Sequence, residues 1–164
     1  MPDSSYGKLW YPDGFRAARE TPLRSSTETP RTALRMVSIA TWGGASITRL
    51  ERHADTWWLI QKAVDEKEPR PRLSYNDSAR VPTEQATALV ALAAASDYWT
   101  HPPQSCRQGL DGYDVILEAR VGTAYSAVDC WVPQEPGAAA VVATVRALDA
   151  LYERVFRNSG RDDR

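Results

Sequence analysis

Hydrophobic and polar residues alternate along two neighbouring stretches in the second half of the chain. In residues 113–120 the odd positions are Tyr, Val, Leu and Ala, and the even positions include Asp114 and Glu118. Residues 124–132 return with the same period, and Gly122 between them can adopt the positive φ of a tight turn. A period of two is typical of a half-buried strand. We therefore predict a β-hairpin whose first strand packs on the core through its odd positions.

Four earlier stretches also favour strands. Gly43 and Gly44 follow the first of them, and Ala54 and Asp55 follow the second. Such short turns cannot hold the crossover that parallel strands need, so we predict an antiparallel meander. The fourth stretch is poorly hydrophobic and is expected at an edge of the sheet. The four stretches are residues 34–42, 45–53, 56–64 and 73–81.

Two stretches carry apolar residues at helical spacing instead. Residues 83–96 follow Pro82 and are rich in alanine, which permits close packing on a sheet. Residues 138–157 repeat Val, Leu and Tyr every three or four positions, and we expect both apolar stripes to face the core. The sequence thus predicts an α+β fold, with an antiparallel sheet of about six strands and two helices packed on one face.

The two ends of the chain differ in composition from this domain. Residues 1–33 contain four prolines and many Ser and Thr residues, which favours an extended N-terminal arm. Trp10 and Phe15 are large and apolar, so we expect the arm to lie against the domain or against a partner. Residues 34–157 are predicted to form the single α+β domain, and residues 158–164 a disordered tail.

Composition narrows the class of protein without defining a function. The 164 residues suit one domain, and 43% hydrophobic with 25% charged residues is ordinary for a globular chain. A net charge of −1 gives no reason to expect nucleic acid or a membrane surface as a partner. No apolar run approaches the roughly 20 residues of a membrane helix, and no signal peptide is recognisable. A cytoplasmic location is therefore expected.

The chain has two cysteines, Cys106 and Cys130. They are too few for a disulfide framework, and two unpaired thiols are the simplest expectation. The alternative is a single bridge between the loop of Cys106 and the hairpin. There is no CxxC pair, and only His53 and His101 could assist, so neither a metal site nor another cofactor is expected.

The sequence lacks the motifs of common catalytic sites, because it contains no P-loop, GxSxG or HExxH. The best pair of carboxylates is Glu118 and Asp129, on neighbouring strands of the hairpin. A cross-strand polar contact explains this pair without catalysis. Together with His53 or His101, the pair defines the alternative hypothesis of a small hydrolase.

Aromatic residues are numerous, and the six tryptophans exceed the need of a core this size. Trp and Tyr are enriched at binding hot spots. Two of the aromatic residues share the hairpin face opposite the expected core. If no helix covers that face, it is an exposed patch of the kind that marks a partner site; if a helix covers it, both rings are core. The candidate binding residues are Tyr125, Trp131, Asp129, Glu118, Tyr98 and Trp99.

The hairpin resembles a group of small, mostly uncharacterised bacterial proteins. Their shared string is LDG, a strand ending in Leu-Glu, a turn, then Tyr and a strand ending in Trp-x-Pro. Two positions depart from that group, with Ser126 where His is frequent and Cys130 where Arg is frequent. The resemblance implies a fold more than an activity. The matching residues are Leu110, Asp111, Gly112, Leu117, Glu118, Tyr125, Trp131 and Pro133.

These observations favour a non-enzymatic protein-binding module. More specifically, we expect a small bacterial immunity protein that neutralises a cognate toxin, because small bacterial proteins of diverse sequence often serve this role. The alternatives are the hydrolase described above and a homo-oligomeric structural protein, whose surplus aromatic residues would lie in a homodimer interface.

Overall fold

The described part of the chain consists of six strands and two long helices. The computed structural model describes residues 13–24, 32–40, 44–65, 70–95, 112–131 and 139–157, except for the side chain of Trp131. The strands are β1 (Thr32–Ala40), β2 (Ala45–His53), β3 (Thr56–Asp65), β4 (Arg72–Val81), β5 (Tyr113–Val121) and β6 (Ala124–Trp131). The helices are α2 (Thr83–Ala94) and α3 (Ala139–Tyr152), and a π-helical turn, η3 (Glu153–Arg157), continues α3. The predicted tail lies outside the described residues.

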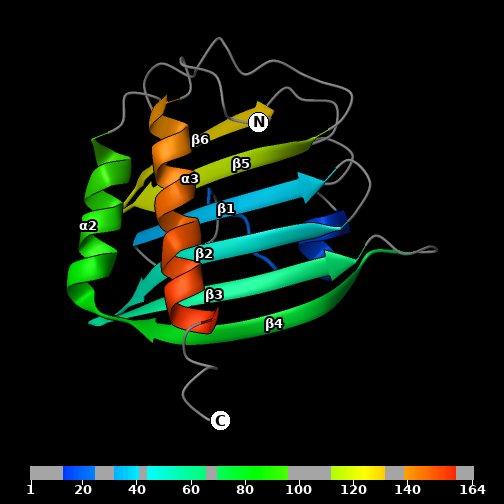
Figure 1. The fold of residues 1–164 in the computed structure, drawn as a ribbon, viewed down its shortest axis with the longest axis horizontal. Coiled ribbons are helices and arrows are strands. Elements are labelled where there is room, and N and C mark those ends of the chain that lie inside the picture. Colours follow the sequence, from blue (N-terminus) through cyan, green and yellow to red (C-terminus); the bar gives the residue numbers. More distant parts are fainter. Residues whose placement is uncertain are drawn as a thin grey trace.

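All strand pairs in the sheet are antiparallel, in the order β4-β3-β2-β1-β5-β6. The first four strands form the predicted meander, and β4 lies at an edge as its poor hydrophobicity suggests. The chain then passes through α2 and returns to β5, which pairs with β1 in the middle of the sheet (Figure 1). The predicted α+β class and the six-stranded antiparallel sheet are thus confirmed.

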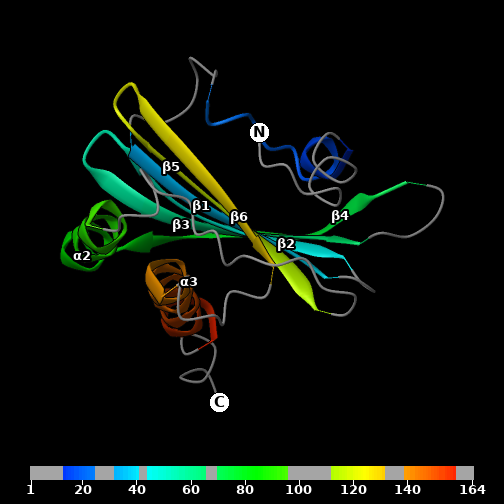
Figure 2. The same cartoon turned by 90° about the horizontal axis from the view of Figure 1, so that it is seen from above.

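The helices α2 and α3 lie on the same face of the sheet, as predicted (Figure 2). Alternation along the strands places Leu34, Leu59 and Leu117 on this face, where they pack in one buried cluster with Leu89 of α2 and Leu148 of α3. Burying a side chain of this size contributes about 1.5–3 kcal/mol. Within the described residues, neither helix has the length and apolarity needed to cross a membrane.

The opposite face of the sheet is covered by residues 13–24, called here the N-terminal segment (Figure 2). Phe15 and Ala18 of the segment pack in a second buried cluster with Val37 and Ile116. Residues 13–17 form a helical turn, where the composition predicts an extended arm. The difference arises because this turn packs on the sheet, a non-local contact that local composition cannot reveal.

The strand β5 is therefore buried on both faces. Its odd positions face the helices, as predicted. The even positions, expected to lie opposite the core, include Asp114, Ile116 and Glu118, and all three are buried as well. A strand beneath two layers has no solvent face, so the polar side chains on it need partners inside the protein.

Cys130 on β6 is buried and disulfide-bonded, and no described cysteine is free. The expectation of an unpaired thiol at this position is therefore wrong. Cys106 is the only other cysteine of the sequence and lies outside the described residues. Spacing along the chain could not settle the state of Cys130, because it does not show which loop meets this strand in space.

Candidate functional site

The N-terminal segment covers a buried group of charged residues, called here the ionic cluster. At its centre is Arg35 of β1, whose neighbours across the sheet are Arg49 on β2 and Glu118 on β5. The Nε and Nη2 atoms of Arg35 lie 2.7 Å and 2.6 Å from Oε2 of Glu118. The other carboxylate oxygen of Glu118 accepts a 2.7 Å hydrogen bond from the hydroxyl of Tyr125. The cluster consists of Glu20, Arg35, Arg49, Glu51, Lys62 and Glu118.

Glu20 joins the N-terminal segment to this cluster. Its carboxylate is fully buried and contacts three cations: Arg35 at 2.9 Å, Lys62 at 2.6 Å, and Arg49. Burial by itself would raise the pKa of Glu20, but the coulombic attraction of Arg49 and the hydrogen bond from Lys62, together with Arg35, hold it below its ordinary value. The carboxylate is therefore ionised where it lies.

Cationic side chains of the sheet also bind the main chain of the N-terminal segment. Lys62 Nζ donates to the carbonyl of Ala18 at 2.8 Å, and Arg35 Nη1 donates to that of Thr21 at 2.9 Å. Arg120 Nη1 donates to the carbonyl of Leu23 at 2.9 Å. Lys62 Nζ also makes a longer bond of 3.4 Å to the carbonyl of Arg19. The sheet thus holds the segment at four carbonyls as well as at Glu20, and each donor is charged, which strengthens the bonds.

His53 lies at the border of the cluster. Its Nε2 is 2.6 Å from Oε1 of Glu51, while Glu51 Oε2 contacts Arg49 Nε at 2.7 Å. Glu118 is engaged by Arg35 and Tyr125 instead. The histidine and carboxylates of the hydrolase hypothesis are therefore not brought together in the described part, and His101 lies outside it.

Two further carboxylates of the same sheet face occupy the β5–β6 pair. The register places Asp129 diagonally between Asp114 and Glu118. Burial, and then the charge of Asp129, raise the pKa of Asp114 to about 6. No group of three or more His, Cys, Asp or Glu side chains in the described residues is arranged to hold a metal ion.

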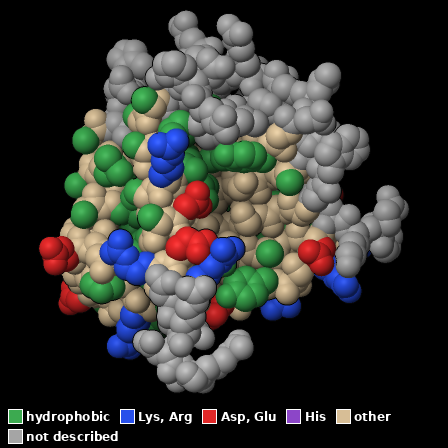
Figure 3. All heavy atoms as spheres, viewed as in Figure 1, with side chains coloured by type: hydrophobic (Ala, Val, Ile, Leu, Met, Phe, Trp, Pro, Cys, Tyr) green, Lys and Arg blue, Asp and Glu red, His purple; other side chains and the backbone are tan. Residues whose placement is uncertain are grey.

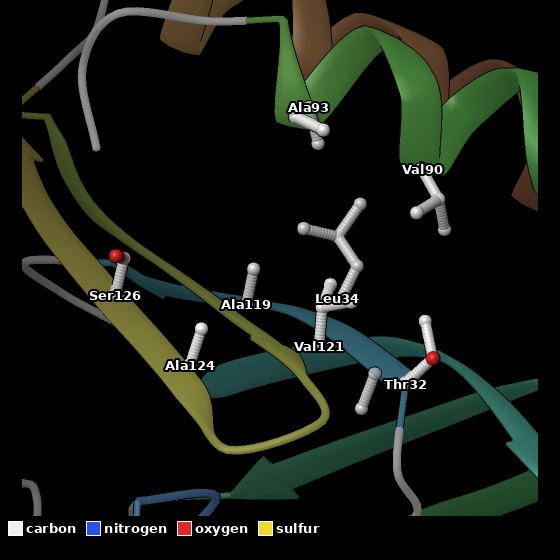
Figure 4. A pocket seen from close by; sticks show the side chains of 10 residues that line it. Thr32, Leu34, Val90, Ala93, Ala119, Val121, Ala124 and Ser126 are labelled. Atoms are coloured by element: carbon white, nitrogen blue, oxygen red, sulfur yellow. The ribbon is translucent and has the colours of Figure 1, made fainter. Parts of the chain in front are cut away.

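A second feature lies on the helix face of the sheet. An apolar cleft, called here the α2 cleft, separates α2 from the hairpin end of the sheet (Figure 4). Its volume is about 240 Å³. Val90 points into it from α2, and Leu34 points up from β1. The floor of the cleft includes the small side chains of Ala119, Ala124 and Ser126. Larger side chains at these positions would fill the space. The lining residues are Thr32, Ala33, Leu34, Val90, Ala93, Ala94, Ala119, Val121, Ala124 and Ser126.

The outer surface of α2, called here the α2 surface, lies on another side of the helix than the cleft and is poor in charge. The exposed positions of α2 include Ala88, Ala91 and Leu92, and Glu84 is the only charged residue of the helix. Even the hydroxyl of Thr87 is bonded within the helix, to the carbonyl of Thr83 at 2.8 Å. In Figure 3 hydrophobic side chains dominate over α2, whereas charged side chains follow α3. A helix that is apolar on its outer side is expected to be covered.

The structure places the candidate binding residues in different surroundings. Glu118 is buried, Tyr125 is half-buried with its hydroxyl on Glu118, and Asp129 lies on the same face. Glu118 cannot meet a partner unless the N-terminal segment moves away. Tyr98, Trp99 and the side chain of Trp131 lie outside the described residues.

Four residues of the ionic cluster were not among the candidates predicted from the sequence: Glu20, Arg35, Arg49 and Lys62. The sequence did contain one signal. Arg35 lies on the same strand face as Val37 and Ile39, and the other positions of that face are apolar. An arginine on an otherwise apolar strand face indicates a buried cation, which needs a carboxylate partner.

No family model matches the chain, and no curated protein matches it in sequence.

Proposed function

We propose that this protein is a non-enzymatic binding module whose α2 cleft receives an apolar side chain of a protein partner. The observation that carries the proposal is an apolar cleft that is lined in part by exposed apolar residues of α2 and of the hairpin, namely Ala94, Val121 and Ala124. Val121 at the cleft is 53% exposed and Leu92 on α2 is 39% exposed. Exposed apolar side chains around an apolar cleft are typical of an interaction site.

The chemistry of the cleft favours an apolar occupant. Among the described residues that line it, the side-chain polar groups are the hydroxyls of Thr32 and Ser126, and none of these residues is charged. A polar metabolite would lose its hydration there without gaining partners. An aliphatic or aromatic side chain would gain about 1.5–3 kcal/mol from burial.

Within this class we propose an immunity protein that neutralises a cognate toxin. The support is the small single-domain fold, and the resemblance of the hairpin to small bacterial proteins. The hydrolase alternative has less support, because His53 contacts Glu51 whereas Glu118 is engaged by Arg35 and Tyr125.

The test compares variants that alter one exposed hydrophobic residue each. Val121→Asp places a charge at the cleft, and Tyr75→Asp is the matched control, since Tyr75 is 41% exposed but lies on β4. We expect a partner captured from the native cells, once purified, to bind Val121→Asp at least tenfold more weakly than the wild type. The Tyr75→Asp variant should bind with unchanged affinity. Equal affinity for both variants contradicts the proposed site.

Two further readouts separate the parts of the proposal. Expression of the purified partner's gene alone should arrest growth, and co-expression with this protein should restore it; a harmless partner removes the immunity role and leaves the binding role. Sedimentation of the isolated protein decides between a foreign partner and a second copy. A dimer that Val121→Asp dissociates would assign the α2 cleft to self-association instead.

The disulfide of Cys130 bears on where the protein works. Structural disulfides are typical of oxidising compartments and rare in the cytoplasm. The bond therefore weighs against the cytoplasmic location expected from the sequence. Rapid alkylation of thiols in intact cells decides between them, because a cytoplasmic protein is expected to be alkylated at both cysteines and a protein from an oxidising compartment at neither.

A further inference from the structure

We infer that the sheet face beneath the N-terminal segment is a peptide-binding groove for a segment that carries one carboxylate. Residues 13–24 fill this groove as an intramolecular ligand, and an acidic peptide of the same pattern can replace them. The groove lies on the face opposite the α2 cleft, so this inference does not rest on the function proposed above.

The charges of the groove require one carboxylate from the occupant. Without Glu20, the ionic cluster holds three cations and two carboxylates. Arg35 is paired with Glu118 and Arg49 with Glu51, whereas the described ion-pair partner of Lys62 is Glu20 alone. A buried ammonium without a counter-charge is strongly unfavourable. The groove therefore selects a peptide that places a carboxylate at Lys62.

The remaining contacts are those of peptide recognition. Four carbonyls of the segment accept bonds from Lys62, Arg35 and Arg120, and such contacts are independent of the side chains that the peptide carries. Specificity comes from two apolar anchors. Phe15 is buried against Arg35, whose guanidinium carbon lies 4.4 Å from the centroid of the Phe15 ring. Leu23 is fully buried. The recognised pattern is an aromatic residue, a carboxylate five positions later, and an aliphatic residue three positions after that.

The segment can leave without opening the sheet. Its described backbone hydrogen bonds are internal, from the amides of Ala18, Arg19 and Glu20 to carbonyls at positions 14, 16 and 15. Its described hydrogen bonds to the sheet come from side chains of the strands, so the strand ladder stays complete when it departs. Water would then hydrate the released cations, which lowers the cost of opening.

Fluorescence anisotropy with a labelled peptide of residues 13–24 tests the inference on the full-length chain. The protein variant Glu20→Gln keeps its own segment but weakens its hold. We expect this variant to bind the wild-type peptide saturably, and at least tenfold more tightly than the intact wild-type protein does. A Glu20→Gln peptide should bind the variant at least tenfold more weakly. An Arg16→Ala peptide is the control with unchanged affinity, because the side chain of Arg16 is 79% exposed.

Equal binding of the wild-type and Glu20→Gln peptides, or binding of neither, overturns the inference. If the variant protein does not fold, native-state hydrogen exchange of the wild type decides. The amides of Ala18 and Glu20 should then exchange through a local opening that leaves the amides of β1 and β2 protected. Exchange of these two amides only with global unfolding would mean that the segment does not leave the groove.

Discussion

At the scale of single residues, the buried charges of Arg35 and Glu118 must be compensated inside the protein. Both side chains are fully buried, where an unpaired charge would cost several kcal/mol or more. Two contacts join the guanidinium to one carboxylate oxygen of Glu118, and Tyr125 donates to the other. Tyr125, a candidate binding residue by sequence, thus has a role in satisfying a buried charge.

The hydroxyl of Tyr125 should therefore contribute to stability. Tyr125→Phe keeps the ring and removes the 2.7 Å bond to Glu118, so we expect the free energy of unfolding to fall by about 1.5–3 kcal/mol, as for hydrogen bonds to charged groups. Urea denaturation measures this change. Tyr75→Phe is the matched control, because its hydroxyl makes an exposed 3.3 Å bond to Asp77, and its effect should stay within about 0.5 kcal/mol. Equal effects of the two variants contradict the role of Tyr125.

At the scale of elements, the helical turn of the N-terminal segment ends in a helix-terminating motif. The amide of Glu20 donates to the carbonyl of Phe15 at 2.8 Å, and the amide of Arg19 donates to that of Arg16 at 3.1 Å. Arg19 has a φ of 52°, the left-handed conformation that glycine usually occupies at this position. This reversal turns Glu20 toward the ionic cluster, so the backbone strain at Arg19 serves the placement of the carboxylate.

Two glycine substitutions in this segment should have opposite signs. Arg19→Gly removes the left-handed strain and is expected to stabilise the protein by about 1 kcal/mol. Arg16→Gly lies within the helical turn, where glycine costs about 1 kcal/mol. Thermal unfolding of the two variants gives the comparison, since both lose an exposed arginine and gain the same flexibility in the unfolded chain. Destabilisation by Arg19→Gly would show that the strain is not relieved.

The same elements show how far the sequence alone could predict the structure. The strands and both long helices followed from their periods of two and of three to four, which are local signals. The turn at residues 13–17 did not, because a single turn has no period and this one depends on contacts with the sheet. The ionic cluster was equally out of reach, since Glu20 and Lys62 are 42 positions apart in the numbering and meet only in the fold.

The α2 cleft could not be predicted for a related reason. Its existence depends on the distance between α2 and the end of the hairpin, which is set by packing elsewhere in the molecule. The alanines that form its floor are compatible with close helix packing. The alanines of α2 were likewise predicted to permit close packing on the sheet. Small residues permit both a tight contact and a cavity, and only the arrangement of the layers decides between them.

At the scale of the whole molecule, the sheet is covered by two unlike layers. The helix layer is held by apolar contacts, and the N-terminal segment adds ion pairs to a smaller apolar cluster. The pKa of Glu20 is lowered in the fold, so the stability from this carboxylate is present at neutral pH and is lost as the pH falls. The second layer therefore contributes stability that is lost in acid, through the titration of Glu20.

Asp114 gives the opposite dependence, because its pKa is raised from 3.8 to about 6 by burial and by Asp129. Between these values the folded protein holds a proton that the unfolded chain has released. The free energy of unfolding should therefore fall as the pH rises from about 4 to about 6, by an amount on the order of 2 kcal/mol.

Urea denaturation at a series of pH values measures this change as the difference between wild type and Asp114→Asn, which cancels the contribution of Glu20. Asp55→Asn, whose side chain is 98% exposed, should follow the wild-type profile. A profile of Asp114→Asn parallel to the wild type would mean that Asp114 titrates like a solvated aspartate, and that water reaches this end of the buried face.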